Sequence, residues 1–399
     1  MRIASANTFD IGIDNLSHRQ AELIDVQNQI SSGKRVTRAS DDPAAAARAE
    51  RAMASLGRTA ISQRAVEASK VAMTQTESAL GDAGTLLQRA RELMVSAGNP
   101  GLGDSDRNSV ADEIRSIRDQ LVSIANQSDG AGTYLFGGQG ARQKPFIDST
   151  SGVQFAAVSG QTLTESSTGL PLTTDGRAAW LSARTGNGVF ATSAGASVAA
   201  ATIDGGSVSD PSALTGSAYT LQFTVSGGST TYAVLRDGLP TALVAAPYVS
   251  GQAITIDGMT LAISGTPATG DQFQIVPSTP TLSVFDALDG AEAALRTPAR
   301  TGSQIAQSNG ESLRNLDSVM AGLQSARSAA GQILNRIDDQ SEQLEGQKLA
   351  GETARSNAED VDMVHAISDF QNRQTGYDAA LKSYAMVQRL SLFQYVNGS

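Results

Sequence analysis

The sequence contains no cysteine and only two histidines among its 399 residues. Without cysteine, neither a disulfide framework nor a thiolate metal site can form. His18 and His365 lie near opposite ends of the chain, and neither belongs to an H-E-x-x-H pattern that could begin a zinc site. We therefore expect no metal site, and we interpret both histidines as solvated or packed side chains.

Aromatic residues are scarce, at 5% of the sequence, and no apolar run approaches the ~18 residues that a membrane-spanning helix needs. Asp10 and Asp14 interrupt the first apolar stretch, so no signal peptide is predicted. The net charge of −10 would repel nucleic-acid phosphates and anionic lipid headgroups. We expect neither nucleic-acid binding nor membrane insertion.

The motifs of common enzyme classes are also missing. Gly33-Lys34 resembles the end of a phosphate-binding loop, but Asn28 and Arg35 stand where that motif needs glycine and Ser/Thr. The glycines of GNGVF and GTYLFGG lack the strand and helix context of a dinucleotide fingerprint, and no G-x-S-x-G elbow occurs. A Ser/His/Asp triad stays open from the sequence alone. We predict no catalytic residue, no cofactor and no enzyme activity.

Helical periodicity dominates the first part of the chain. A seam with alternating four- and three-residue spacing precedes Gly33 and consists of Phe9, Ile13, Leu16, Gln20, Leu23, Gln27 and Ile30. Between residues 66 and 94 large apolar residues recur every seven positions, with small residues at the intervening seam positions. The GNPG sequence at 98–101 stops this helix, and a third helix is expected after a cap at Asp104 or Ser105.

The C-terminal part has a similar pattern. A heptad series runs from Leu313 to Leu344. A second seam consists of Met363, Ile367, Phe370, Gln374, Tyr377, Leu381, Tyr384 and Gln388. Long seams at both ends predict that the two termini pack on each other.

The middle of the chain, from about 140 to 280, changes character. YTLQFTV, GGS and TTYAVLRDG together predict a hairpin, and AITIDGMTLAI predicts another with Asp257-Gly258 at its turn. The predicted fold class is α+β: an elongated antiparallel helical coiled coil or bundle built from both termini, with a β-rich middle domain inserted. The expected segments are 1–32, 33–42, 43–140, 141–280, 281–358 and 359–399.

The stretch SSGKRVTRASDDPAAAA predicts a joint between two helices. Gly33 suits the left-handed residue just past a helix end, and Pro43 is allowed in the first turn of the next helix. Asp42 is expected to cap that helix, with an extended segment over 33–42. Asp41 and Asp42 can face the basic side chains of Lys34, Arg35 and Arg38. An ordinary polar loop is the alternative interpretation.

The joint resembles the N-terminal signature of the flagellin superfamily, S-S-G-x-R-I-x-x-A-x-D-D-x-A after a hydrophobic residue. The matching positions are Ile30, Ser31, Ser32, Gly33, Arg35, Val36, Ala39, Asp41, Asp42 and Ala44. LLQRARELMVSAGNP, at 86–100, is similar to a second conserved flagellin helix. ARSNAEDVD resembles the R-S-x-x-E-D-x-D motif near the other end, through Arg355, Ser356, Glu359, Asp360 and Asp362. The resemblance covers about the first 140 and the last 110 residues.

Within the superfamily, several details are similar to the branch that joins the hook to the filament. They are Pro43 after the acid pair, GTYLFGG, GTPATGDQFQIVP and the ending YAMVQRLSLFQYV. The proline-containing ending of filament flagellins is missing. A filament flagellin remains the alternative, and a secreted membrane translocator would need an apolar hairpin that the chain lacks.

The resemblance implies a secreted, extracellular, non-catalytic protein that forms a ring in the flagellar axis. Its implied partners are hook-associated protein 1, flagellin, further copies of itself and a flagellar export chaperone, after type III export with an uncleaved N-terminus. The expected assembly residues are Phe9, Ile13, Leu16, Leu23, Ile30, Met363, Ile367, Phe370, Tyr377, Leu381, Tyr384, Leu392 and Phe393. The expected joint residues are Gly33, Arg35, Asp41, Asp42 and Pro43.

Overall fold

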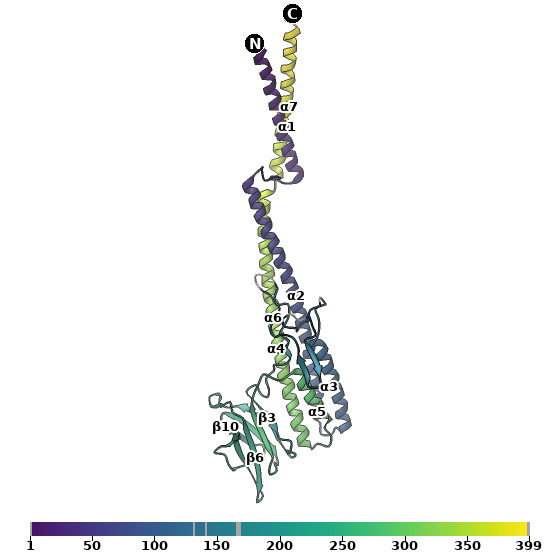
Figure 1. The fold of residues 1–399 in the computed structure, drawn as a ribbon, viewed down its shortest axis with the longest axis vertical. Coiled ribbons are helices and arrows are strands. Elements are labelled where there is room, and N and C mark those ends of the chain that lie inside the picture. The colour runs from purple at the N-terminus through teal and green to yellow at the C-terminus, as the bar shows by residue number, and fades with distance from the viewer. Residues whose placement is uncertain (1, 131, 140–141, 165–168, 397–399) are drawn as a thin grey trace. The chain divides into compact units, whose positions relative to one another are not determined.

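The computed structural model describes residues 2–130, 132–139, 142–164 and 169–396, with side chains from 10 to 387 within these ranges. The described residues form seven α-helices and twelve strands (Figure 1). The helices are α1 (Arg2–Ser32), α2 (Pro43–Ala97), α3 (Asp104–Ala125), α4 (Gly176–Trp180), α5 (Val284–Arg296), α6 (Gly302–Glu359) and α7 (Met363–Val396). No helix in the described part of the chain combines the length and apolar character of a membrane span.

The chain divides into two compact units. Unit 1 contains residues 1–64 and 340–399, and unit 2 contains residues 65–339. In unit 1, α1 and α7 lie side by side, and the first part of α2 pairs with the last part of α6 (Figure 1). The predicted association of the two terminal segments is confirmed for these helices.

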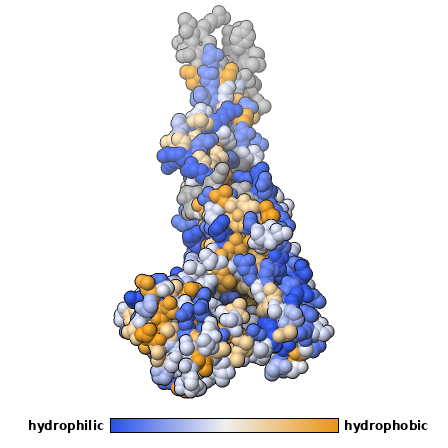
Figure 2. Space-filling view, turned by 60° about the horizontal axis from the view of Figure 1, so that its bottom comes forward, coloured by the Kyte–Doolittle hydropathy of each residue, from blue (hydrophilic) through white to orange (hydrophobic). Residues whose placement is uncertain are grey.

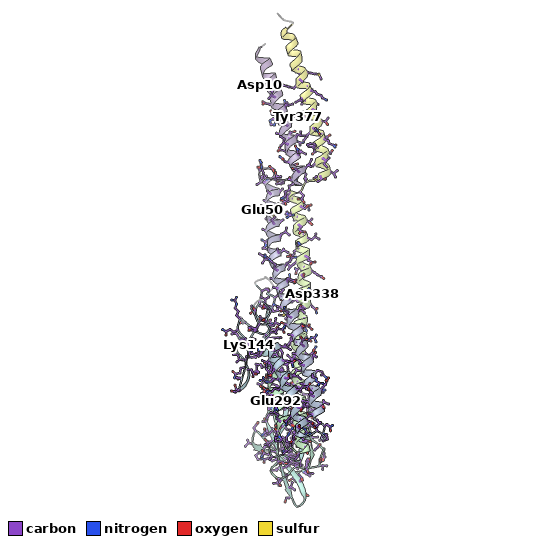
Figure 3. All side chains as sticks on the ribbon, turned by 90° about the vertical axis from the view of Figure 1, so that its right-hand side faces the viewer. Asp10, Glu50, Lys144, Glu292, Asp338 and Tyr377 are labelled. Atoms are coloured by element: carbon purple, nitrogen blue, oxygen red, sulfur yellow. The ribbon has the colours of Figure 1, made fainter. Side chains whose placement is uncertain are left out.

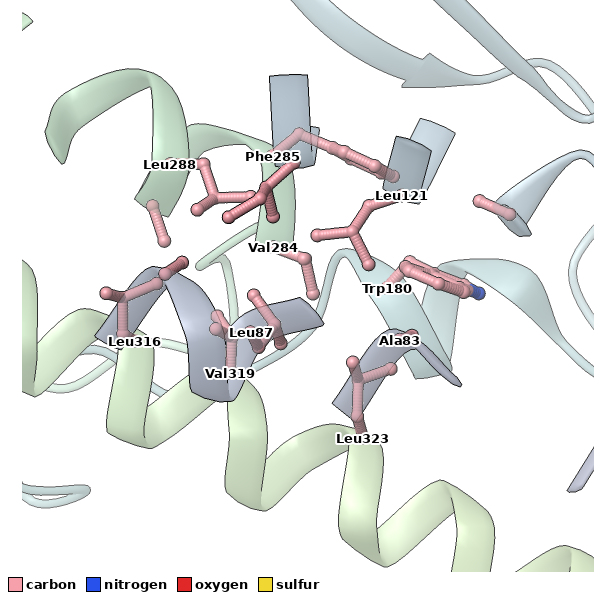
Figure 4. Packing of buried hydrophobic residues seen from close by; sticks show 14 of the residues in the cluster. Ala83, Leu87, Leu121, Trp180, Val284, Phe285, Leu288, Leu316, Val319 and Leu323 are labelled. Carbon is pink, nitrogen blue, oxygen red and sulfur yellow. The ribbon is translucent and has the colours of Figure 1, made fainter. Parts of the chain in front are cut away.

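The helical part of unit 2 has a core built from α2, α3, α5 and α6. The predicted heptad on α2 is confirmed, because its large and small members are all buried: Val66, Ser69, Met73, Thr76, Leu80, Ala83, Leu87, Ala90, Met94 and Ala97. Figure 4 shows Leu87 and Ala83 close to Leu316, Val319 and Leu323 of α6. Small residues facing large ones let the helices approach closely.

Helix α3 begins directly after a glycine cap. The cap was expected one or two residues later, at Asp104 or Ser105. Gly103 is the N-cap residue, and the Asp106 carboxylate accepts a hydrogen bond from its backbone N–H at 3.1 Å. That carboxylate satisfies one of the unpaired groups at the helix start, so the capping side chain lies inside the first turn.

Residues 142–164 and 169–183 pack on this helical core. Strands β1 (Phe146–Ser149) and β2 (Gly152–Phe155) form an antiparallel hairpin that contacts α3 and α5. Phe146 and Trp180 are fully buried in the helical core, where Trp180 stacks on Phe285 with ring centroids 5.8 Å apart. This segment therefore shares the core of the helices, although the sequence analysis assigned it to the middle domain.

The two larger sheets lie between Phe190 and Pro277. Their strands are β3 (Phe190–Ala194), β4 (Ala201–Ile203), β5 (Ser207–Val208), β6 (Tyr219–Ser226), β7 (Ser229–Arg236), β8 (Leu239–Pro240), β9 (Ala246–Pro247), β10 (Ala253–Ile256), β11 (Met259–Gly265) and β12 (Gln272–Pro277). One sheet has the order β3-β12-β6-β7-β8 with β9 beside β7, and the other has β10-β11-β4 with β5 beside β11. A short 3-10 helix spans Pro211–Ala213.

Both predicted hairpins are confirmed. Strands β6 and β7 pair antiparallel from Tyr219 opposite Arg236 to Ser226 opposite Ser229. Strands β10 and β11 turn at Asp257 and Gly258, whose φ angles are 42° and 79°. Two successive positive φ angles match the twist that a tight hairpin turn requires. The sheets enclose their own apolar core, which includes Phe190, Phe223 and Phe273.

Candidate assembly site

The expected assembly residues lie on α1 and α7, which pack against each other only along a narrow seam. The buried members of this seam are Val26 and Ala366. Half-buried side chains extend the seam at Leu16, Leu23, Ile30, Phe370, Tyr377 and Tyr384. Tyr377 is labelled on α7 in Figure 3.

The seam on α1 has a different phase from the one predicted. Gly12 lies against the Tyr384 ring, where a Cβ atom would come within 3.1 Å of the ring carbon Cδ2. Ile13, Gln20 and Gln27 were assigned to the seam and are instead exposed. Gly12, Leu16, Leu23, Val26 and Ile30 follow a four-and-three pattern in which the exposed Arg19 occupies the position between Leu16 and Leu23. This phase brings the smallest residue opposite an aromatic ring.

Several predicted assembly residues face solvent in this single chain. Ile13 is 49% exposed on α1, and Leu381 is 45% exposed on α7. Met363 and Ile367 are also exposed. Phe9, Leu392 and Phe393 were predicted to belong to the same surface, but their side chains lie outside the described residues.

Other apolar side chains on these helices are also exposed, although no sequence pattern singled them out. They are Ile11, Ile24, Val364, Met386 and Val387. Figure 2 shows apolar patches among the hydrophilic side chains over the visible face of the terminal helices. Exposed apolar side chains gathered on one helix pair indicate an interaction surface, because their contact with water is unfavourable. The arrangement can bind further amphipathic helices.

Charged side chains lie along the α1/α7 seam at two places. The Arg373 guanidinium lies 3.2 Å from the Glu22 carboxylate. Arg19 reaches over Gly376, where an added Cβ would come within 2.9 Å of its Nη1 atom. Long charged side chains therefore border a seam that contains few large apolar residues.

The joint is a compact crossing of two chain segments. Helix α1 ends at Ser32, Gly33 has a φ of 71°, and α2 begins at Pro43. The expected extended segment is not observed: residues 39–41 form a turn, closed by a 3.0 Å hydrogen bond from Asp41 N–H to the Arg38 carbonyl.

Two aspartates organise this turn. The Asp41 carboxylate accepts hydrogen bonds from the N–H groups of Thr37 and Arg38, at 3.1 and 2.8 Å. The Asp42 carboxylate accepts from the N–H groups of Ala44 and Ala45, at 3.1 and 2.9 Å, and so caps α2. The Arg38 N–H lowers the pKa of Asp41, and the Ala45 N–H lowers the pKa of Asp42.

Arginine and lysine side chains tie the turn to the end of α6. Arg35 Nη1 lies 3.2 Å from Asp42 Oδ2, and its Nη2 donates to the Ala358 carbonyl at 3.0 Å. Lys34 was expected to face the aspartates of the joint, but it pairs with Glu359 at 3.2 Å. Among the described contacts, Arg38 meets Asp41 through its backbone N–H and carbonyl, and its side chain takes no part.

Backbone hydrogen bonds join the two chain segments that cross in the joint. Arg35 N–H donates to the Glu359 carbonyl at 2.7 Å, and Val361 N–H donates to the Gly33 carbonyl at 3.0 Å. Asp362 then caps α7 by accepting from the N–H groups of Val364 and His365, at 3.0 and 3.1 Å. The list of expected joint residues omitted Glu359 and Asp362, although the R-S-x-x-E-D-x-D motif contains both.

The described residues contain no cluster of metal-ligating side chains. No group of three or more His, Asp or Glu side chains there could hold a metal ion. The strongest charged cluster is structural: Arg118 of α3 lies 2.6 Å from Asp148 of β1 and 2.5 Å from Asp289 of α5. The hydrogen bonds to Asp148 raise the pKa of Arg118 above its usual value and lower that of Asp148. This cluster holds the β1–β2 hairpin on the helices.

Comparisons with known proteins place both terminal regions among flagellar proteins. Residues 11–141 match the bacterial flagellin N-terminal helical region, and residues 313–396 match the bacterial flagellin C-terminal helical region. Residues 191–277, which contain the two larger sheets, match a D2-like domain of flagellar hook-associated protein 1.

Individual flagellar proteins are also similar to this chain. Flagellar hook-associated protein 3 of Salmonella typhimurium is 37% identical over 161 residues, which are 38% of this chain and 48% of that protein. The chain thus spans about half the length of the curated relatives it matches first. The crystal structure of Xanthomonas campestris FlgL is 30% identical, with a TM-score of 0.69, over 77% of this chain and 99% of that chain. Phase 1 flagellin of Salmonella naestved is 33% identical over 152 residues, which are 38% of this chain and 28% of that flagellin.

Proposed function

The chain belongs to the family of flagellar hook-associated protein 3, or FlgL, and from this premise we propose that it is a structural component of the bacterial flagellum. Its place is the junction between hook and filament. The observation that carries the proposal is the match to Xanthomonas campestris FlgL along 99% of that chain. The exposed apolar side chains of α1 and α7 support it, because they give the chain a surface for assembly.

Assembly by the terminal helices follows from their incomplete burial. Covering a large apolar side chain contributes ~1.5–3 kcal/mol, and nine such side chains on the described parts of α1 and α7 are exposed in one chain. Helices of neighbouring copies in a ring would cover them. The predicted assembly residues that are exposed, such as Ile13 and Leu381, are then contacts between copies.

The joint has a mechanical role in this proposal. Gly33, Arg35, Asp41, Asp42 and Pro43 join α1 to α2 through a crossing that is hydrogen-bonded to the end of α6. An isolated loop would let α1 move independently of α7. The hydrogen-bonded joint instead holds α1 and α7 together where they begin. The two helices can then enter a ring as one element.

The partners and the route of export belong to the same proposal. Hook-associated protein 1 lies on the hook side of the ring and flagellin on the filament side. The chain reaches the cell exterior through the flagellar type III apparatus, with its C-terminal helix held by an export chaperone before assembly. The role is non-catalytic, and no cofactor takes part.

The test uses a bacterial strain that lacks its own hook–filament junction protein. Expression of this full-length chain is expected to restore attached filaments, seen by electron microscopy, and swimming in soft agar. Purified chain is expected to bind purified hook-associated protein 1. Normal chain secretion without restored filaments, together with no binding, would contradict the proposal.

A filament flagellin is the second candidate, because flagellin shares the N-terminal region. The two candidates differ in polymerisation. A flagellin forms long filaments from purified monomer when seeded, whereas a junction protein stops after a thin ring. Long filaments built of this chain alone would favour the second candidate.

A further inference from the structure

Two opposite sides of one helix pair in unit 1 carry opposite charge. This pair, here named the rod pair, consists of residues 43–64 of α2 and 340–359 of α6. Its helices are antiparallel: Arg35, just before α2, bonds to Ala358, and Leu56 further along contacts Gly351. Rising numbers on one helix therefore meet falling numbers on the other.

Burial defines the seam of the rod pair. On α2 the buried or half-buried positions recur by four and three residues at Ala45, Ala49, Ala52, Leu56 and Thr59. On α6 the same spacing includes Ser341, Leu344, Gly351 and Ala358, with Lys348 and Arg355 at the intervening positions. These residues are the a and d positions of a heptad. In an antiparallel pair, the e and b positions of both helices share one side, and the g and c positions share the other.

The g and c side is basic. Arg48, Arg51 and Arg58 of α2 lie there, and all three are exposed. The facing positions on α6 are neutral: Gln340, Gln343, Gln347, Ala350, Ala354 and Asn357. Among the described contacts, none of the three arginines has a carboxylate partner, and Arg48 and Arg51 donate only to backbone carbonyls of their own helix.

The e and b side is acidic. Glu342, Glu345 and Glu352 of α6 lie there with Glu50 of α2, which is labelled in Figure 3, and Arg64 is the one basic residue at these positions. All five side chains are exposed, and none of the five has an ion-pair partner within the described part of the chain. Two exposed apolar residues, Met53 and Leu349, lie among them.

The spacing of the two sets is complementary. Arg51 and Arg58 are seven residues apart, and so are Glu345 and Glu352, which is ~10.5 Å along a helix. Because α2 and α6 run in opposite directions, Arg51 of one copy can meet Glu352 of a parallel neighbour while Arg58 meets Glu345. A contact between two different sides of identical chains is head-to-tail. Such contacts form a ring when the rotation between neighbours closes, and an open helix when it does not.

From this geometry we infer that the basic side of the rod pair binds the acidic side of the rod pair in a second copy of this chain. Met53 and Leu349 contribute apolar contact at the centre of the acidic side. The inference rests on the proposed ring, and it adds the residues that set which side of one copy meets its neighbour. Electrostatic complementarity of this kind fixes orientation and register.

Cysteine crosslinking tests the contact directly, since the native chain has no cysteine. The full-length chain carrying Arg51→Cys with Glu352→Cys is expressed in the strain that lacks its junction protein, and isolated flagella are treated with a short bis-maleimide. Both positions of one copy lie on opposite sides, so a crosslink joins two copies. A ladder of dimers and larger species is expected. The matched control, Glu50→Cys with Glu352→Cys, keeps both thiols on the acidic side and should give no ladder.

Charge reversal gives a second, independent readout. Arg51→Glu with Arg58→Glu should reduce the number of cells with attached filaments ~10-fold, since like charges would then face each other. Glu345→Arg with Glu352→Arg should do the same, and all four substitutions in one chain should restore filaments. Arg142→Glu with Lys144→Glu makes the same change in net charge outside the rod pair and should have no effect.

The outcomes separate this inference from the proposed function. If the unaltered chain does not restore filaments, the proposed function fails. The inference is overturned by a different result. In that case the unaltered chain restores filaments, the charge-reversed variants restore them equally well, and crosslinking gives no specific ladder, so the charged sides do not meet.

Discussion

The helical core of unit 2 and the terminal pair α1/α7 carry similar heptad patterns but differ in burial. Along α2, Leu80 and Leu87 are fully buried, because three further helices and the β1–β2 hairpin surround this part of the seam. Along α1, Ile13 and Ile24 remain exposed, because α7 covers one narrow side only. A heptad thus predicts that a side chain will be buried. The number of neighbouring helices decides whether the burial is complete within one chain or needs further copies.

The difference has an energetic consequence. Fixing each residue costs ~1–2 kcal/mol of backbone entropy, and isolated helices are marginal in water. In unit 2 the buried core offsets that cost within one chain. The described side chains of the α1/α7 pair bury too little apolar surface to do so, and we expect the order of the pair to depend on neighbouring copies.

Truncation of a core side chain should have the largest effect on the monomer. Leu87→Ala should lower the free energy of unfolding of unit 2 by ~2–5 kcal/mol, because it leaves a cavity among helices that cannot close. Thermal and urea denaturation of the full chain measure this. The matched variant Ile13→Ala should change monomer stability by less than ~0.5 kcal/mol yet impair filament attachment. Equal destabilisation by the two variants would contradict the contrast between the regions.

Loss of Arg118 should have an intermediate effect. Arg118→Met removes the charge that bridges Asp148 and Asp289 and should destabilise unit 2 by ~1–2 kcal/mol, reduced by the partial exposure of both aspartates. Because the pKa of Asp148 is lowered in the folded chain, this stabilisation is present above the ordinary aspartate value of 3.8 and is lost as the pH falls below it. Denaturation curves from pH 7 to pH 3 should therefore converge for the two proteins. A constant difference across that range would refute the ionic explanation.

Two glycine substitutions compare the joint with a helix. Gly33→Ala should destabilise the joint by ~1–2 kcal/mol, because alanine is strained at a φ of 71°. Gly57→Ala, inside α2 with open space around its Cβ position, should stabilise that helix by ~0.5–1 kcal/mol. Hydrogen exchange of the flanking amides measures both. If both variants shift exchange in the same direction, backbone conformation is not the cause.

Much of this contrast could be predicted from the sequence, and particular residues show where prediction stopped. The burial of Val66, Met73 and Leu80 followed from a strict seven-residue repeat of large residues with small ones between. On α1 two overlapping patterns compete, and the packing of Gly12 against Tyr384 and the burial of Val26 decide the phase. A sequence pattern gives the spacing of a seam, whereas the partner helix sets its phase.

The candidate site was predictable to a similar degree. The helix end at Gly33 and the cap at Asp42 depend on local backbone preferences, which can be inferred from the residue types alone. The bonds from Lys34 and Arg35 to Glu359 and Ala358 join segments more than 300 residues apart, and no local rule predicts them. The same holds for residues 142–164 and 169–183, which have β and turn signals but pack on a helical core.

Amide hydrogen exchange of the dilute full-length monomer, resolved by mass spectrometry, tests the central claim most directly. We expect fast exchange in residues before Gly33 and after Asp362, and strong protection from Val66 to Met94. In isolated flagella with the chain assembled, the terminal helices should become protected as well. Strong protection of both α1 and α7 in the dilute monomer would contradict the claim that their order depends on neighbouring copies.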